Sequence, residues 1–219
     1  MVTSIRRYAQ IVDILGKYGF GIAMERMFPG RAGFRLPTAG GPSDTSTVYE
    51  RIRLAVEELG PTFVKFGQIM STRTELLPPE LIEELKKLQD HARPLPFSEV
   101  QAVISETCPD INEWFQSIDE TPLASASIGQ VHCAVLKDGT KVAVKVQRPG
   151  IPELIETDLN ILMSMADRID AVFPEIRIYN PVGMVHDFSQ QIRKELDFTR
   201  DARNADRMSR NFRDDTGIR

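Results

Sequence analysis

The spacing of apolar residues changes abruptly near the middle of this chain, and that change limits the folds it can adopt. Residues from about 123 to 146 alternate between apolar and polar types and are rich in β-branched side chains, as strands are. Asp138 and Gly139 stand between two such runs, which predicts an antiparallel hairpin. Helical spacing dominates on both sides of this region. Four helices, a small sheet and two helices therefore predict an α+β fold.

Capping residues and prolines set the expected limits of the helices. The first four are expected to start at a Thr47–Glu50 capping box, at Pro61, at Pro78-Pro79 (ending near Asp90) and at a box formed by Ser98 with Gln101. Helical spacing returns after the sheet, beyond Pro152. A single long helix is then expected from about Pro181 to Phe212.

The start of the predicted sheet is similar to a phosphate-binding loop. Residues 124–131 read A-S-A-S-I-G-Q-V, and Lys145 ends the run V-A-V-K. Protein kinases carry G-x-G-x-x-G-x-V followed by a strand ending in V-A-I-K, so Ala124 and Ala126 stand where two glycines belong. Glycine lets a backbone approach phosphates closely and adopt positive φ, and alanine restricts both. The loop therefore predicts nucleotide binding with a geometry unlike that of an ordinary kinase.

Each part of this region has an expected role toward ATP or ADP with Mg²⁺. Backbone N–H groups of the loop cover the phosphates, and Lys145 reaches the α- and β-phosphates. Ala143 lies on the same side of its strand as Lys145 and is small enough for adenine to pack on, while Val131 closes the other face of the base. A plain hairpin with Lys145 in solvent is the alternative. The predicted nucleotide-binding residues are Ala124, Ser125, Ala126, Ser127, Ile128, Gly129, Val131, Ala143 and Lys145.

Charge is distributed unevenly along the chain. Residues 1–40 hold six Lys or Arg against two acidic residues, whereas the whole chain carries a net charge of −4. Two interpretations of this basic, amphipathic segment stay open: it lies on an anionic membrane surface, or it packs on the domain with a solvated basic face. Nucleic acid is excluded as a partner because the chain is acidic overall and has no sustained basic face. The apolar residues at helical spacing are Ile5, Tyr8, Ile11, Val12 and Leu15.

Other site classes find little support in the sequence. Cys108 and Cys133 lie far apart, which favours reduced structural thiols in the cytoplasm. The three histidines show no ligand spacing, so no histidine metal site is expected. Neither a signal peptide nor a run of about 18 apolar residues is present, so the expected location is cytoplasmic, with a peripheral position at the inner face of the membrane as an option.

Three motifs together resemble a known family. They are K-F-G-Q at residues 65–68, the alanine-rich A-S-A-S-I-G-Q-V-H, and E-L-D-F-T-R at residues 195–200. This combination resembles the UbiB family of atypical kinase-like proteins, which is linked to ubiquinone and other isoprenoid-quinone biosynthesis. The resemblance implies a protein-kinase-like N-lobe with an N-terminal helical extension folded over the nucleotide site. The expected units are residues 1–42 (basic helix and a linker from Pro29 to Pro42), 43–118 (extension) and 119–219 (N-lobe).

The resemblance also implies roles for particular residues. Lys65 and Gln68 belong to the extension motif in the active-site cleft, and Glu195 and Asp197 form an E-x-D motif that engages Lys65. Taken by itself, Lys65 would be interpreted as an ordinary solvated lysine. The partner of Lys145 stays open between Glu195 and no acidic residue, because glutamines occupy positions 190 and 191 where a second glutamate is expected. Asp201 stands where the family usually has glutamate.

A complete phosphotransferase also needs a catalytic Asp, an Asn and a second metal-binding Asp from a C-lobe. None can be placed in this sequence, so the C-lobe is expected to be absent, in a fragment or a truncated gene product. The 219 residues alone are expected to be inactive, with the Mg²⁺ ligands and catalytic base supplied by that lobe. Protein, lipid and water all stay open as phosphate acceptors. The alternative function is a non-catalytic pseudokinase scaffold that binds lipid or quinone-biosynthesis proteins.

Overall fold

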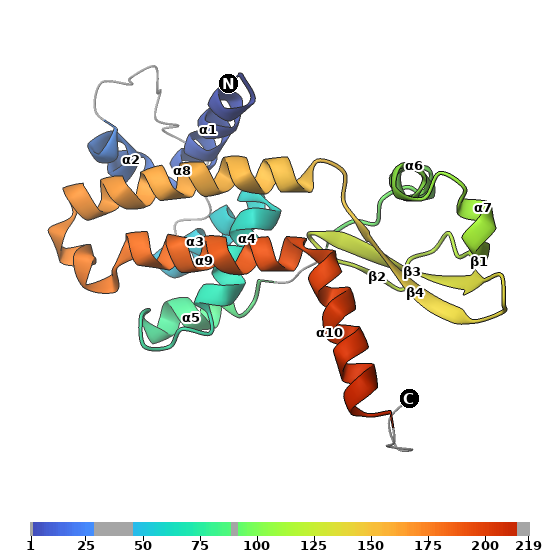
Figure 1. Ribbon diagram of the computed structural model, residues 1–219. Coiled ribbons are helices and arrows are strands. Elements are labelled where there is room, and N and C mark those ends of the chain that lie inside the picture. Colours follow the sequence, from blue (N-terminus) through green and yellow to red (C-terminus); the bar gives the residue numbers. More distant parts are fainter. Residues whose placement is uncertain (1, 29–45, 89–91, 214–219) are drawn as a thin grey trace.

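A long helical hairpin and a four-stranded sheet lie end to end in this chain, and a last helix projects from the point where they meet (Figure 1). The computed structural model describes residues 2–28, 46–88 and 92–213. The elements are α1 (Val2–Leu15), the π-helical η1 (Gly16–Phe20), α2 (Gly21–Met27), α3 (Val48–Leu59), α4 (Pro61–Met70), α5 (Pro79–Leu85), α6 (Phe97–Thr107), α7 (Ile111–Trp114), β1 (Phe115–Ile118), β2 (Ala124–Ser125), β3 (Gly129–Leu136), β4 (Lys141–Gln147), α8 (Ile151–Val172), the 3₁₀ helix η2 (Pro174–Tyr179), α9 (Pro181–Leu196) and α10 (Phe198–Asn211).

Local signals set some helix limits and not others. The side chain of Thr47 accepts a hydrogen bond from the backbone N–H of Glu50, so the predicted cap of α3 is confirmed. The predicted cap of α6 is wrong: the helix begins at Phe97 after an extended Pro96, which places Ser98 inside the first turn. For α5 the predicted start at Pro78-Pro79 is confirmed, but the predicted end near Asp90 is wrong, because the helix ends at Leu85 and the chain turns so that Leu88 packs beside it.

The main hydrophobic core lies between the α8–α9 hairpin and helices α1, α3 and α4. Ile155 of α8 and Phe188 and Ile192 of α9 have no solvent exposure. The Phe188 ring meets Phe66 of α4 edge to face, with ring centroids 5.0 Å apart. Each such side chain contributes about 1.5–3 kcal/mol by burial, so this core holds the helical part together.

The N-terminal helix belongs to this core. Ile11, Val12 and Ile14 of α1 are buried, so packing on the domain accounts for the amphipathic pattern of the segment. Arg7 of α1 reaches across to Asp158 of α8, with its Nε 2.7 Å and its Nη2 3.0 Å from the two carboxylate oxygens. The expected linker from Pro29 to Pro42 lies outside the described residues.

The sheet is antiparallel throughout, with β3 at its centre. β4 pairs along the length of β3, while β1 and β2 pair with its two ends. The predicted hairpin is confirmed: Gly139 has a positive φ of 86°, and the Asp138 carboxylate accepts from the backbone N–H of Thr140. One face of the sheet packs on α6 through Val100, Ile104 and neighbouring apolar residues.

The prediction of one long helix from Pro181 to Phe212 is wrong. The chain leaves helical geometry at Asp197 (φ −84°, ψ 85°), and a new helix, α10, starts there in a different direction (Figure 1). The Asp197 carboxylate accepts hydrogen bonds from the backbone N–H groups of Thr199 and Arg200. Such local bonds compete with the helical ladder, which is why aspartate favours the N-cap over the helix interior.

Candidate functional site

The sheet has a second face that α6 does not cover, and it carries the strand residues singled out in the sequence. Cross-strand register pairs Val131 with Lys145, Cys133 with Ala143, and Ala124 with Val131. Directly opposed residues of antiparallel strands point to the same face, so these five side chains share one surface. Ala143, Lys145 and Ala124 are exposed, and Val131 and Cys133 are half-buried. We refer to this surface as the open face of the sheet.

The alanine-rich loop closes on itself at one end of the open face. The backbone N–H of Ala126 donates to the carbonyl of Gly129 at 2.9 Å, next to the short pairing of β2 with β3. A Cβ atom added to Gly129 would lie 2.6 Å from the carbonyl oxygen of Val146, so this position requires glycine. Ala124 sits in an ordinary strand pair, where glycine is not needed. Ile128 points elsewhere, into the main core.

Arg148 fastens this loop, and the sequence analysis did not identify it. Its Nε donates to the carbonyl of Ala126 at 2.8 Å, and its Nη2 donates to the Ser125 hydroxyl at 2.9 Å and to the carbonyl of Arg93 at 2.8 Å. Arg93 belongs to the extension (residues 43–118) and lies shortly before α6. The guanidinium therefore connects the loop to the extension. Its position directly after the V-A-V-K strand is the only signal that the sequence offers.

A buried polar network supports β3 from the side covered by α6. The Nδ1 atom of His132 lies 2.8 Å from the carbonyl oxygen of Asp119, and its Nε2 lies 3.1 Å from the amide nitrogen of Gln130. The Gln130 side-chain oxygen accepts from the backbone N–H of Leu95 and from the Ser125 hydroxyl. These bonds are mutually consistent when His132 is neutral and carries its proton on Nδ1. The alanine-rich loop is thus also held from the side of the sheet that α6 covers.

Lys145 forms an ion pair that the sequence analysis left open. Its Nζ lies 2.6 Å from Oδ2 of Asp201, which comes from the first turn of α10, and 4.0 Å from the centroid of the Phe198 ring. Both charged side chains are about half exposed, at 45% and 50%. The partner is therefore neither Glu195 nor absent. The chain changes direction at Asp197, and Asp201 in the first turn of the new helix lies beside Lys145.

The motif residues of the extension lie beside the same helix junction. Nζ of Lys65, on α4, lies 3.1 Å from Oε2 of Glu195 near the end of α9, and Gln68 donates to the carbonyl of Leu88 at 3.4 Å. Asp197 instead caps α10, and the Thr199 hydroxyl that donates to its carboxylate lowers the pKa of this group below its usual range. Of the two E-x-D carboxylates, Glu195 is thus the one that pairs with Lys65.

A cavity of about 690 Å³ separates the extension from the loop region. Its lining includes Ser127, Arg148 and Gly150 from the loop region and Gly60 and Val64 from the extension. Predicted nucleotide residues therefore divide between two surfaces, because Ser127 faces this cavity while Ala143 and Lys145 lie on the open face of the sheet. Within residues 2–28, 46–88 and 92–213, no group of three His, Cys, Asp or Glu side chains could hold a metal ion.

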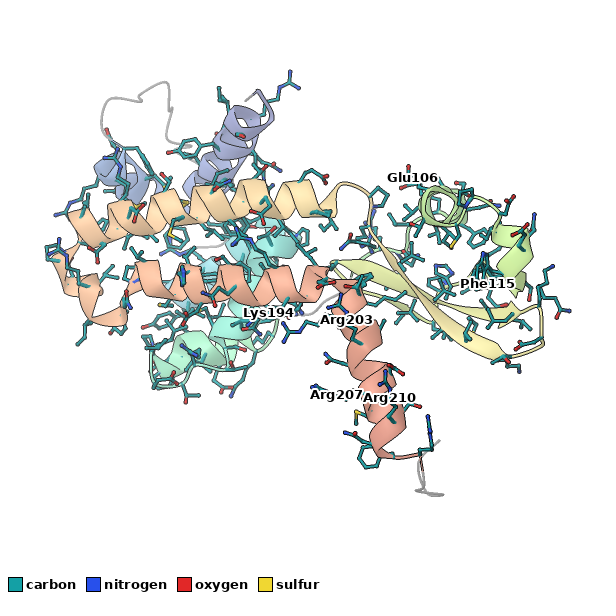
Figure 2. The ribbon with its side chains drawn as sticks, viewed as in Figure 1. Glu106, Phe115, Lys194, Arg203, Arg207 and Arg210 are labelled. Atoms are coloured by element: carbon teal, nitrogen blue, oxygen red, sulfur yellow. The ribbon has the colours of Figure 1, made fainter. Side chains whose placement is uncertain are left out.

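Basic side chains lie along the last two helices. Figure 2 shows Arg203, Arg207 and Arg210 along the projecting α10, and Lys194 near the end of α9. Across the described parts of the chain, the helices are too short or too polar to cross a bilayer. The side chains of α10 are almost all solvent-exposed.

Comparison with known proteins gives a consistent picture. The model of the ABC1 atypical kinase-like domain matches residues 87–219. Two curated relatives named "Probable protein kinase UbiB", from Marinobacter nauticus and Pseudomonas fluorescens, are 45% and 44% identical over 74% of this chain. A solved structure, the complex of Rv3197 with erythromycin from Mycobacterium tuberculosis, is 34% identical, with a TM-score of 0.50 over 74% of this chain.

The relatives are longer than this chain. It spans 30% of the length of the two curated relatives and 41% of the solved chain. The matches confirm the predicted fold class, an α+β, kinase-like N-lobe with a small antiparallel sheet and a helical extension. They also confirm the resemblance on which the sequence analysis relied.

Proposed function

Because the chain belongs to the ABC1 atypical kinase-like family, we propose that residues 119–219 are the nucleotide-binding N-lobe of a UbiB-type atypical kinase or ATPase. Residues 43–118 form its extension, which is helical up to α7 and ends in β1, a strand that pairs with β3 of the sheet. The names of the relatives support a role of the whole protein in isoprenoid-quinone biosynthesis, as an enzyme or a regulator. The observation that carries the proposal is the position of Lys145 on the open face, paired with a carboxylate from α10.

The open face offers a distinct contact for each part of ATP or ADP. Adenine packs on Ala143 and beside Val131, because the first side chain is small and the second apolar, on paired strands. The phosphates lie toward Lys145, under the backbone of residues 124–129. Asp201 orients the ammonium group toward them, as a helix glutamate does in protein kinases. Since no group among the described residues could hold a metal ion, Mg²⁺ would take its protein ligands from elsewhere, and we propose that the chain by itself binds nucleotide weakly and does not transfer phosphate.

Binding of Mg-ADP and Mg-ATP to wild type and to Lys145→Ala tests this proposal directly. We expect the substitution to weaken binding at least tenfold, because a charge-assisted contact to phosphate contributes about 1.5–3 kcal/mol. Equal affinity of the two proteins would remove the nucleotide site from the open face.

Two cysteines provide a second readout on the same samples. Cys133 lies on the open face opposite Ala143, whereas Cys108 packs with residues on the side of α6. Bound nucleotide should slow alkylation of Cys133 about tenfold at a concentration ten times its dissociation constant. Alkylation of Cys108 should keep its rate, which makes it an internal control. Equal protection of both thiols would indicate general stabilisation instead of a ligand on the open face.

A non-catalytic scaffold is the second candidate, and exposed apolar side chains on the helical part favour it. Ile5 and Ile22 are 67% and 77% exposed, on α1 and α2, where a lipid surface, an isoprenoid lipid or a quinone-biosynthesis protein could contact them. Phosphate release from ATP by the full-length protein discriminates between the candidates. Release that depends on Lys145 supports the kinase or ATPase, and nucleotide binding without any turnover supports the scaffold.

A further inference from the structure

The first residue of α10 occupies the phosphate end of the open face. The Phe198 ring lies with its centroid 4.0 Å from Nζ of Lys145. The Cζ atom of the same ring lies 3.2 Å from where a Cβ atom of Gly129 would stand. The ring therefore reaches from the end of the alanine-rich loop to the strand lysine. Phosphates bound under the loop and held by Lys145 would need this same space.

We propose that Phe198 is an aromatic gate at the phosphate end of the nucleotide site, a proposal that rests on the nucleotide-binding function above. With the ring in place, the Lys145 ammonium is already satisfied by Asp201 and by the face of the aromatic ring. A nucleotide gains its phosphate contacts only when the ring moves aside. Its apparent affinity is then the intrinsic affinity reduced by the fraction of molecules in which the gate is open.

The gate gives Gly129 a second reason to be glycine. A side chain there would meet the carbonyl oxygen of Val146 at 2.6 Å and also the Phe198 ring at 3.2 Å. The loop that replaces glycine with alanine at two positions thus keeps glycine where the ring lies. This pattern is consistent with a loop whose glycine makes room for an aromatic side chain as well as for phosphate.

The backbone just before Phe198 is bound to the helical extension and also to the sheet. Three residues before Phe198, Glu195 pairs with Lys65 of the extension at 3.1 Å. The carbonyl of Leu196, between them, accepts a hydrogen bond from the Gln147 side chain of β4 at 3.1 Å. The helical extension therefore holds the gate closed through the junction of α9 and α10. Loss of the Lys65 contact should loosen the ring without any change on the open face itself.

The opposite role for Phe198, as a platform on which the ligand packs, predicts the opposite sign. A platform loses affinity when it is truncated, whereas a gate gains it. The experiment measures the dissociation constant of Mg-ADP by calorimetry for wild type, Phe198→Ala and Phe198→Leu. Phe212→Ala is the matched control, since Phe212 ends the same helix, far along the chain from the site, and is 38% exposed.

We expect Phe198→Ala to bind Mg-ADP about threefold to tenfold more tightly, the range that corresponds to losing one cation–π contact. Phe198→Leu, which keeps apolar volume without an aromatic face, should give a smaller gain, and Phe212→Ala should give none. Lys65→Ala should also tighten binding, and adding it to Phe198→Ala should bring little more, because both changes open one gate.

Unchanged or weaker binding by Phe198→Ala, in a protein that melts within a few degrees of wild type, would overturn the gate. If Phe198→Ala fails to fold, Phe198→Leu serves as the test: tighter Mg-ADP binding supports the gate, and unchanged or weaker binding overturns it. Different results would contradict the gate and the nucleotide site. When Lys145→Ala abolishes binding but Phe198 variants match wild type, only the gate is lost. When Lys145→Ala binds as wild type does, the nucleotide site itself is wrong.

Discussion

Replacement of Arg7 by alanine should destabilise the chain by about 3–5 kcal/mol, because it leaves a buried carboxylate without a partner. The Asp158 side chain has no solvent exposure and that of Arg7 has 11%. The guanidinium donates to both carboxylate oxygens, to the carbonyl of Leu59 at 2.7 Å and to the Gln10 side chain at 2.9 Å. One side chain thus joins α1 to α8 and to the end of α3.

The chain contains its own control for this prediction. Arg193 of α9 binds Glu156 of α8 with the same bidentate geometry, since its Nε and Nη2 donate to the two carboxylate oxygens at 2.7 and 2.9 Å. The two side chains are, however, 52% and 46% exposed. Solvent screens this pair, so Arg193→Ala should cost no more than about 1 kcal/mol. The two ion pairs share their geometry and differ in burial, and Arg7 in addition bonds the Leu59 carbonyl and the Gln10 side chain, so the larger cost of Arg7→Ala includes those two bonds.

Urea denaturation followed by circular dichroism measures both free energies of unfolding. A chain with Arg7→Leu and Asp158→Leu together should recover much of the loss, since no charge is then stranded in the core. The reasoning is refuted if Arg7→Ala costs less than 1 kcal/mol, or if it costs no more than Arg193→Ala. A changed slope with urea in one variant would be fitted separately, because it reports altered compactness of the unfolded state.

Two further predictions concern the loop and the junction. Arg148→Ala should release the alanine-rich loop, so amide hydrogen exchange at residues 124–129 should accelerate while α8 keeps its protection; Arg148→Lys should restore it only in part, because lysine lacks the fork that makes three bonds. Equal exchange in all three proteins would contradict this anchor. The lowered pKa of Asp197 means that its cap stabilises α10 fully above the ordinary aspartate pKa of about 3.9 and is lost as the pH falls through the lowered value. Asp197→Asn, an uncharged cap, should remove that pH dependence of α10 exchange, and a profile like that of wild type would argue against it.

Sequence reasoning succeeded where structure follows from neighbouring residues. The hairpin at Asp138-Gly139 and the cap at Thr47 depend on bonds within four residues, so short motifs were enough to predict them. The nucleotide-loop comparison placed Lys145 on the correct strand for the same reason. The α+β class followed from the order of such local elements, and its kinase-like form followed from the family resemblance.

Sequence reasoning failed where a contact depends on how the chain runs between elements that are distant in sequence. Asp201 was noted in the sequence but not assigned to Lys145, because their pairing requires the helix to break at Asp197. A local signal for that break existed, namely an aspartate followed two residues later by threonine. Arg148 and Gln130 were missed because part of their bonding is to backbone groups of distant segments, the carbonyls of Ala126 and Arg93 and the N–H of Leu95, which no residue type reveals.

The docking of the first helix has a consequence for the synthesis of the protein. Arg7 and Asp158 are 151 residues apart in the chain, so a ribosome that adds about 5–20 residues per second leaves α1 without its partner for roughly 8–30 s. During that interval Ile11, Val12 and Ile14 lack the part of their packing that α8 supplies. Helix α1 is thus made well before α8 and completes its packing only after α8 has been made.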